Sequence, residues 1–164
     1  MTISHEAVAR RLRDAYSGGA VAPLRDALEP TDVDGAYAVQ TINTRYWEAQ
    51  GRRIVGRKAG LTAKAVQVQL GVDQPDFGVL FDDMRIADGG TLDPVRTLQP
   101  KAEAEIAFIL SADLPDADTS IEQVAAAVAC VHAAIEIVDS RIADWKISFA
   151  DTVADNGSSA FFVL

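Results

Sequence analysis

The fold is decided by the stretch Lys101-Ala102-Glu103-Ala104-Glu105-Ile106-Ala107-Phe108-Ile109-Leu110, a strand pattern that carries two acids. Successive side chains of a β-strand point to opposite faces, so Glu103 and Glu105 project together, with Lys101 in line. Two neighbouring carboxylates repel each other unless a cation lies between them or the pair faces water. We therefore expect a strand, otherwise buried, with a pair of acids on one face.

A third acid, Glu136, lies within the apolar run of residues 133–138. An unpaired charge in a buried strand would cost several kcal/mol. One divalent cation would resolve both problems, and carboxylates without clustered His or Cys suit Mg²⁺ or Mn²⁺ better than zinc. The alternative is a solvent-facing strand, on which alternating acids are common.

Composition places the chain among globular proteins of one domain. Its 164 residues are 49% hydrophobic and 24% charged, and the formal charge of -9 argues against a surface that binds nucleic-acid phosphates. No apolar run reaches the roughly 20 residues of a membrane span, and the first residues lack the pattern of a secretory signal. The single cysteine, Cys130, excludes an intrachain disulfide, from which we infer a reducing cytoplasm.

Hydrophobic spacing predicts an N-terminal helical segment over residues 1–50, followed by strand-rich sequence over residues 51–164 of the same domain. Helices are expected over residues 4–16 and from a Thr31 cap to Gly51, and Thr62 is expected to cap a helix over residues 63–70. Ser120 and Gln123 form a capping-box signature for a helix over residues 121–131. The last residues, 160–164, predict a strand in mid-course, so we expect the chain to be a fragment of a longer one.

Taken singly, four polar residues give no sign of chemistry. Lys58 near a strand end is typical of a solvated surface lysine. Asp76, after Pro75, is typical of a turn residue bonded to its own backbone. Cys130 and His132 fall at a predicted helix end, and we interpret His132 as a surface residue rather than a metal ligand.

Five stretches share their order and spacing with one family, and together they extend over most of the chain: VGRKAGLT (55–62), QLGVDQPDFGVLF (69–81), EAEIA (103–107), DSRIADW (139–145) and DTVADN (151–156). They resemble the 2-oxopent-4-enoate (2-hydroxypenta-2,4-dienoate) hydratases of aromatic meta-cleavage pathways, within the fumarylacetoacetate hydrolase superfamily. The resemblance implies an α+β fold with a mixed β-roll. It also implies relatives that continue past the position of Leu164, so that the chain would be truncated at its C-terminus.

The resemblance also assigns roles by position. It implies a homo-oligomer, a divalent Mg²⁺ or Mn²⁺ ion, and a short 2-oxo or 2-hydroxy acid as the substrate. The metal ligands would be Glu103, Glu105 and Glu136; the catalytic residues Lys58 and Asp76; and the substrate-binding residues Lys58, Asp155 and Asn156.

The activity implied is addition of water to 2-hydroxypenta-2,4-dienoate, which gives 4-hydroxy-2-oxopentanoate. Whether Asp76 or a water molecule on the ion moves the protons stays open. One alternative is the 4-oxalocrotonate (2-oxo-3-hexenedioate) decarboxylase of the same superfamily, although the stretch over residues 140–145 is more similar to the hydratase. Another is a non-catalytic assembly partner of that decarboxylase.

Overall fold

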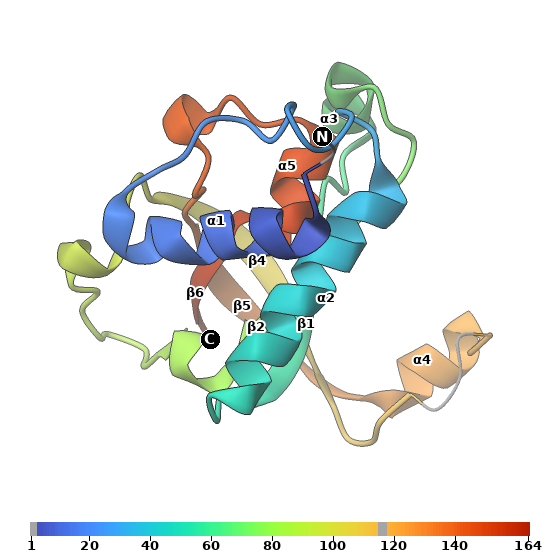
Figure 1. Cartoon of the computed structure of the whole chain (residues 1–164). Coiled ribbons are helices and arrows are strands. Elements are labelled where there is room, and N and C mark those ends of the chain that lie inside the picture. Colours follow the sequence, from blue (N-terminus) through green and yellow to red (C-terminus); the bar gives the residue numbers. More distant parts are fainter. Residues whose placement is uncertain (1–2, 115–117) are drawn as a thin grey trace.

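A layer of helices packs beside two small sheets (Figure 1). The computed structural model describes residues 3–114 and 118–164. Helix α2 (Val33–Ala49) packs against both α1 (His5–Gly18) and α5 (Phe149–Ala154). Apolar side chains from all three helices form one buried core, so this core crosses the boundary predicted near residue 50. No helix among the described residues is long and apolar enough to cross a membrane.

The strands form one two-stranded and one four-stranded sheet. Strands β1 (Ile54–Gly60) and β2 (Asp76–Phe81) are antiparallel. The second sheet has the order β3-β6-β5-β4, in which β3 (Arg85–Ile86) runs parallel to β6 (Ser159–Val163) and the other pairs are antiparallel. The predicted α+β class with a mixed sheet is thereby confirmed.

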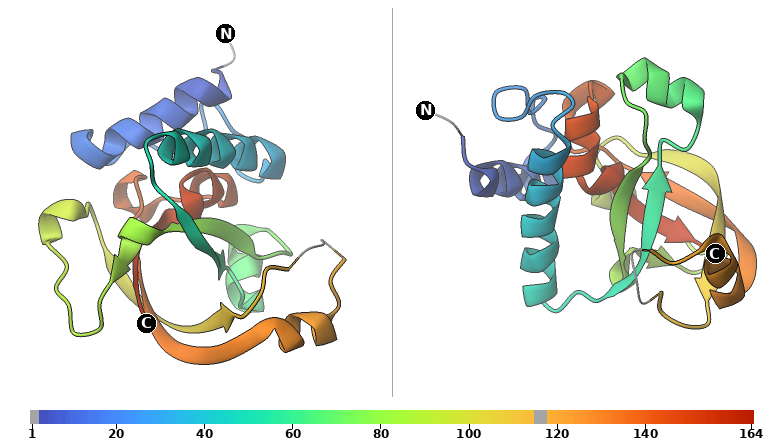
Figure 2. Two further views of the ribbon diagram at one scale, coloured as in Figure 1. Left: turned by 90° about the horizontal axis from the view of Figure 1, so that it is seen from below. Right: turned by 90° about the vertical axis from the view of Figure 1, so that its right-hand side faces the viewer.

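Strands β4 (Lys101–Leu110) and β5 (Val128–Val138) form a long curved ribbon whose concave side faces β1 and β2 (Figure 2). The remaining elements are short, and they comprise α3 (Lys64–Leu70), α4 (Ile121–Ala127) and the 3₁₀ turns η1 (Asp82–Met84), η2 (Pro94–Arg96), η3 (Ala143–Trp145) and η4 (Asn156–Ser158).

The helix caps follow the sequence signals in part. The Ser120–Gln123 capping box is confirmed. Two predicted caps are wrong, because each helix begins one residue later than expected. Asp32 rather than Thr31 caps α2, with its Oδ1 accepting a 2.9 Å bond from the Gly35 amide, and Thr62 precedes the N-cap of α3.

Two expectations for the ribbon are wrong. The predicted helix 121–131 ends at Ala127, because the following residues pair with β4 from Val128 onward and β-branched side chains favour strands. Strand β4 is not buried. Its outer face leaves Ile106 and Phe108 exposed, and its inner face opens into the concave side of the ribbon.

Candidate metal and acid-base site

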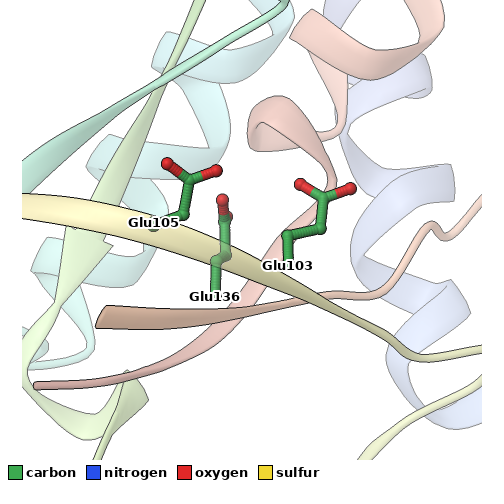
Figure 3. A group of neighbouring side chains, drawn as sticks. All are labelled: Glu103, Glu105 and Glu136. Carbon is green, nitrogen blue, oxygen red and sulfur yellow. The ribbon is translucent and has the colours of Figure 1, made fainter. Parts of the chain in front are cut away.

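Three glutamates converge on the concave side of the β4–β5 ribbon (Figure 3). Glu103 on β4 lies directly opposite Glu136 on β5, and Glu105 follows two residues later on the same face of β4. Each offers one carboxylate oxygen, and these oxygens lie within 4.8 Å of one another. Glu136 is buried, whereas Glu103 and Glu105 are exposed. The convergence expected from the sequence is therefore present in the fold.

Lys58 reaches the cluster from β1. Its Nζ lies 2.9 Å from Glu136 Oε1 and donates a 2.9 Å hydrogen bond to the Gly157 carbonyl. The Lys58 side chain is only 10% exposed, so its interpretation as a solvated surface lysine is wrong. Among the described residues this buried oxygen receives no hydrogen bond of regular geometry, and the ammonium of Lys58 balances its charge. Lys58 thus neutralises one of the three carboxylates of the cluster.

The cluster carries an excess of negative charge. Three carboxylates facing one ammonium leave two formal negative charges. Burial raises the pKa of Glu136, Lys58 opposes that rise, and the neighbouring Glu103 adds to it. A divalent cation would balance this charge, and the three carboxylates would be its ligands. The residues present therefore fit a hard divalent ion.

Asp76 is the first residue of β2 and is buried, so its interpretation as a turn residue is wrong. Its Oδ2 accepts a 3.3 Å hydrogen bond from Thr152 Oγ1, whereas Oδ1 has no partner among the described residues. Burial raises the pKa of Asp76, and the nearby Lys58 lowers it. A buried carboxyl group with a raised pKa and a free oxygen is suited to proton transfer.

Three glycines make room for these side chains. A Cβ on Gly60 would lie 2.2 Å from Asp76 Oδ1. A Cβ on Gly78 would lie 3.0 Å from Lys58 Cγ and 2.6 Å from the Asn156 carbonyl oxygen. Gly157 adopts a φ of +62°, which favours glycine, and presents its carbonyl to Lys58. The positions of Lys58 and Asp76 thus depend on glycines, which leave the space that these two side chains occupy.

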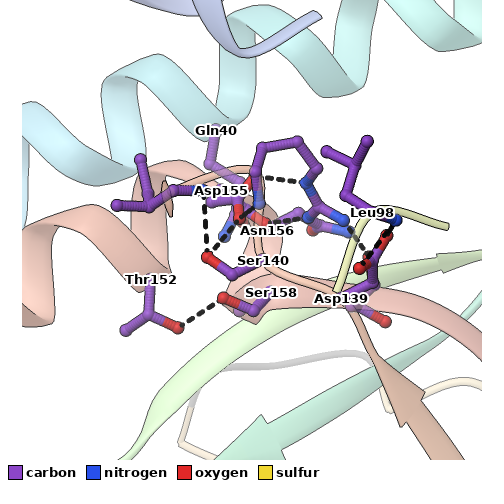
Figure 4. Close-up of polar contacts among 12 residues, drawn as sticks. Gln40, Leu98, Asp139, Ser140, Thr152, Asp155, Asn156 and Ser158 are labelled. Atoms are coloured by element: carbon purple, nitrogen blue, oxygen red, sulfur yellow. Dashed lines mark hydrogen bonds and ion pairs between the residues drawn. The ribbon is translucent and has the colours of Figure 1, made fainter. Parts of the chain in front are cut away.

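Asp155 belongs to a buried ion pair with Arg141, and Figure 4 shows the polar contacts around it. Its Oδ1 accepts a 2.5 Å bond from Arg141 Nε, and its Oδ2 accepts a 2.9 Å bond from the Arg141 amide. Both side chains are almost fully buried. Burial raises the pKa of Asp155 to about 6, although Arg141 acts in the opposite direction. The pair ties the segment that follows β5 to the C-terminal end of α5.

Asn156 ties the same segment to β2. Its Oδ1 accepts a 2.7 Å bond from the Val79 amide, and its Nδ2 donates a 2.9 Å bond to the Val79 carbonyl. The side chains of Asp155 and Asn156 are therefore engaged within the protein, and both residues line a cavity of about 290 Å³ that none of the three glutamates lines. Their contact with a substrate stays a prediction.

Two contributors lie within the stretches that resemble the family, but nothing in those stretches points to their roles. Thr152, the hydrogen-bond partner of Asp76, lies in α5, a short helix that the spacing of apolar residues did not predict. Arg141 lay within a recognised stretch but had no assigned role, because a buried ion pair between residues 141 and 155 depends on how β5 and α5 meet. Hydrogen bonding thus adds Thr152 and Arg141 to the residues that support the site.

Comparisons with known proteins agree with the resemblance found in the sequence. The chain is 55% identical over 163 residues to 2-keto-4-pentenoate hydratase 1 of Dechloromonas aromatica (strain RCB), a match that covers 99% of this chain and 62% of that protein. It is 56% identical over 149 residues to 2-keto-4-pentenoate hydratase of Paraburkholderia xenovorans (strain LB400), covering 90% of this chain and 55% of the relative. No protein-family model matches the chain.

Among solved structures, 4-oxalocrotonate decarboxylase from Pseudomonas putida G7, complexed with magnesium and adipate, is similar with a TM-score of 0.88 and 34% sequence identity. That match covers 99% of this chain and 63% of the decarboxylase chain. The chain spans about three-fifths of the length of the first of these hydratases and of the decarboxylase. The resemblance is confirmed: over nearly its whole length, this chain is a relative of the 2-keto-4-pentenoate hydratases.

Proposed function

We propose that this chain carries the metal and acid-base residues of a divalent-metal-dependent hydratase. The reaction is addition of water to 2-hydroxypenta-2,4-dienoate, in equilibrium with 2-oxopent-4-enoate, to give 4-hydroxy-2-oxopentanoate. The observation that carries the proposal is the convergence of Glu103, Glu105 and Glu136 beside Lys58. Relatives at 55% and 56% identity named 2-keto-4-pentenoate hydratase support this choice of reaction.

The three glutamates are the proposed ligands of Mg²⁺ or Mn²⁺. Their carboxylate oxygens, which lie within 4.8 Å of one another, form the donor set that such ions prefer. A bound divalent ion would supply Lewis-acid stabilisation of negative charge on a 2-oxo acid. The magnesium and the dicarboxylic acid adipate named in the decarboxylase structure support an acid-binding metal site.

Lys58 and Asp76 have separate roles in this proposal, the first in substrate binding and the second in proton transfer. The ammonium of Lys58, held beside Glu136, attracts the substrate carboxylate or the developing enolate oxygen. The carboxyl group of Asp76, with its raised pKa and free oxygen, exchanges protons with the substrate carbon chain. Asp155 and Asn156 support substrate binding by fixing the turn whose Gly157 carbonyl holds Lys58.

The fold, assembly and location are part of the proposal. A β-roll like that of fumarylacetoacetate hydrolases accounts for the concave ribbon and for the similarity to the decarboxylase structure. Homo-oligomers would cover part of the exposed apolar outer face of the ribbon at Ile106, Phe108, Val131 and Ile135. We also propose a cytoplasmic location, which the single cysteine supports.

The decarboxylase is the second candidate function, because a solved 4-oxalocrotonate decarboxylase matches this chain with a TM-score of 0.88. The two activities differ in their products. Loss of diene absorbance without CO₂ indicates the hydratase, whereas CO₂ released from 2-oxo-3-hexenedioate indicates the decarboxylase. A folded chain without either activity that co-purifies with the decarboxylase would instead be an assembly partner.

The decisive experiment measures turnover of the dienoate with Mg²⁺ or Mn²⁺ added and then removed by a chelator. We expect activity only with the ion, and we expect Glu105→Gln to abolish it while far-UV circular dichroism stays unchanged. Glu48→Gln, an exposed acid of α2, is the matched control and should retain full activity. Metal-independent turnover, or full activity of Glu105→Gln, would remove the ion from the proposal.

A further inference from the structure

The concave face of the β4–β5 ribbon continues beyond the glutamates. The cross-strand register pairs Glu105 with Ala134 and Ala107 with His132. Because directly opposed residues of antiparallel strands share a face, His132 lies on the same face as Glu105, one pair further along the ribbon. That step is about 6.7 Å along a strand. The glutamates and His132 therefore line one continuous surface.

His132 is exposed on this surface and is held from one side. Its Nε2 lies 3.4 Å from the sulfur of Cys130, two residues earlier on the same face of β5. Its other ring nitrogen has no hydrogen-bond partner among the described residues. Imidazole can donate or accept a hydrogen bond. An oriented imidazole with a free nitrogen is suited to bind a polar or anionic group.

The side chains that face Glu105 and His132 across the ribbon are small. Ala107 and Ala134 leave the surface open along the ribbon, whereas the outer face at this level carries the bulky side chains of Phe108 and Val131. A short 2-oxo acid held at the glutamates would end beside these alanines. An acid with a longer chain would continue along the same face to His132.

We propose that His132 is a specificity-determining residue that binds a polar or anionic group at the far end of a 2-oxo acid held at the glutamates. The proposal rests on the proposed function, because it takes the three glutamates to be the site of the oxo-acid head. It goes beyond that function by naming the part of the substrate that His132 binds, which is the group at the end of the carbon chain. A terminal carboxylate is bound through a charge-assisted hydrogen bond, and a terminal methyl group is not.

Nuclear magnetic resonance of the histidine side chains tests this contact without turnover. The chain has two histidines, His132 and His5, and His5 in α1 is an internal control. The probes are pyruvate and 2-oxohexanedioate, which share an oxo-acid head but differ in length and in the terminal carboxylate, each added with Mg²⁺. We expect 2-oxohexanedioate to shift the His132 signal, pyruvate to leave it unchanged, and neither acid to move His5.

Kinetics of His132→Asn give a second measurement, with His5→Asn as the matched control. For a 2-hydroxy-2,4-dienoate with a terminal carboxylate, we expect KM to rise about 10- to 150-fold with kcat nearly unchanged, which is the loss of a hydrogen bond to a charged group at about 1.5–3 kcal/mol. The methyl-terminated analogue should show the same KM in wild type and variant. This split separates contact with the substrate tail from a general structural defect.

Calorimetric titration with both acids, with and without Mg²⁺, measures their binding and distinguishes failure of the proposed function from failure of the proposed role of His132. If neither acid binds in a metal-dependent manner, the proposed function is wrong and this inference falls with it. If 2-oxohexanedioate binds with Mg²⁺ but the His132 signal does not move, the inference alone is wrong. An equal rise in KM for both dienoates in His132→Asn would also overturn it.

Discussion

Replacing Glu105 by Gln should have opposite consequences for stability in the absence and in the presence of a divalent cation. Without the ion, Glu105 is an exposed carboxylate beside Glu103 and Glu136, and it has no ion-pair partner among the described residues. Removing its charge relieves repulsion, so the melting temperature of the variant should equal or slightly exceed that of the wild type. With the ion, the variant lacks one of three ligands.

The size of the metal effect follows from linkage. At a Mg²⁺ concentration 100 times Kd, binding to the folded state alone stabilises it by about 2.7 kcal/mol. The entropy of unfolding is about 2.1 cal/mol/K per residue, so that for 164 residues this gain corresponds to about 8 °C in melting temperature. Loss of an outer-shell partner alone weakens metal binding about 10–100-fold, so loss of a direct ligand should cost at least about 100-fold. The variant should then gain only about 0.4 kcal/mol, or about 1 °C, at the same concentration.

Differential scanning calorimetry at several Mg²⁺ concentrations measures both effects in one series. Glu48→Gln changes the same side chain at an exposed position of α2 and should reproduce the wild-type rise in melting temperature. The reasoning is refuted if Glu105→Gln and the wild type rise equally, or if Mg²⁺ leaves the wild type unchanged up to millimolar concentrations. A variant that melts well below the wild type without metal would show that Glu105 has a structural role.

Three further substitutions test the surroundings of the cluster. Burial raises the pKa of Asp76 above its ordinary 3.8, so the wild type should lose stability as the pH rises from about 4 through the raised value. Asp76→Asn should remove this loss, and its advantage in melting temperature should therefore grow as the pH rises above about 4. Gly78→Ala should lower the free energy of unfolding, measured by urea titration, by about 1–3 kcal/mol, because the new Cβ would lie 2.6 Å from the Asn156 carbonyl oxygen. Gly56→Ala is the control, because its Cβ would meet one methyl group at 3.8 Å, and it should lower the free energy of unfolding much less. Asp155→Asn should cost about 3–5 kcal/mol and lower the urea midpoint, because it leaves its guanidinium partner buried and unpaired; a midpoint unchanged within error would show that this ion pair does not hold the segment.

The local sequence was sufficient to predict that two acids share one face of a strand. Alternation along β4 has a period of two whatever surrounds it, so the common orientation of Glu103 and Glu105 follows from the backbone alone. The charge of Glu136 within an apolar run likewise signalled that a partner must exist. These two features, with the resemblance to the hydratases, were enough to name the carboxylate cluster.

Tertiary structure decided which residues complete that cluster. Lys58 and Glu136 are far apart in the chain, and nothing in the residues around Lys58 distinguishes it from a solvated lysine until β1 packs across the ribbon and buries it. The residues around Asp76 in the sequence likewise indicate only a turn. Its burial comes from neighbours in space, including Thr152 of α5. Periodicity specifies the face on which a side chain lies, whereas burial and ion pairing depend on segments distant in sequence, and only packing brings those segments together.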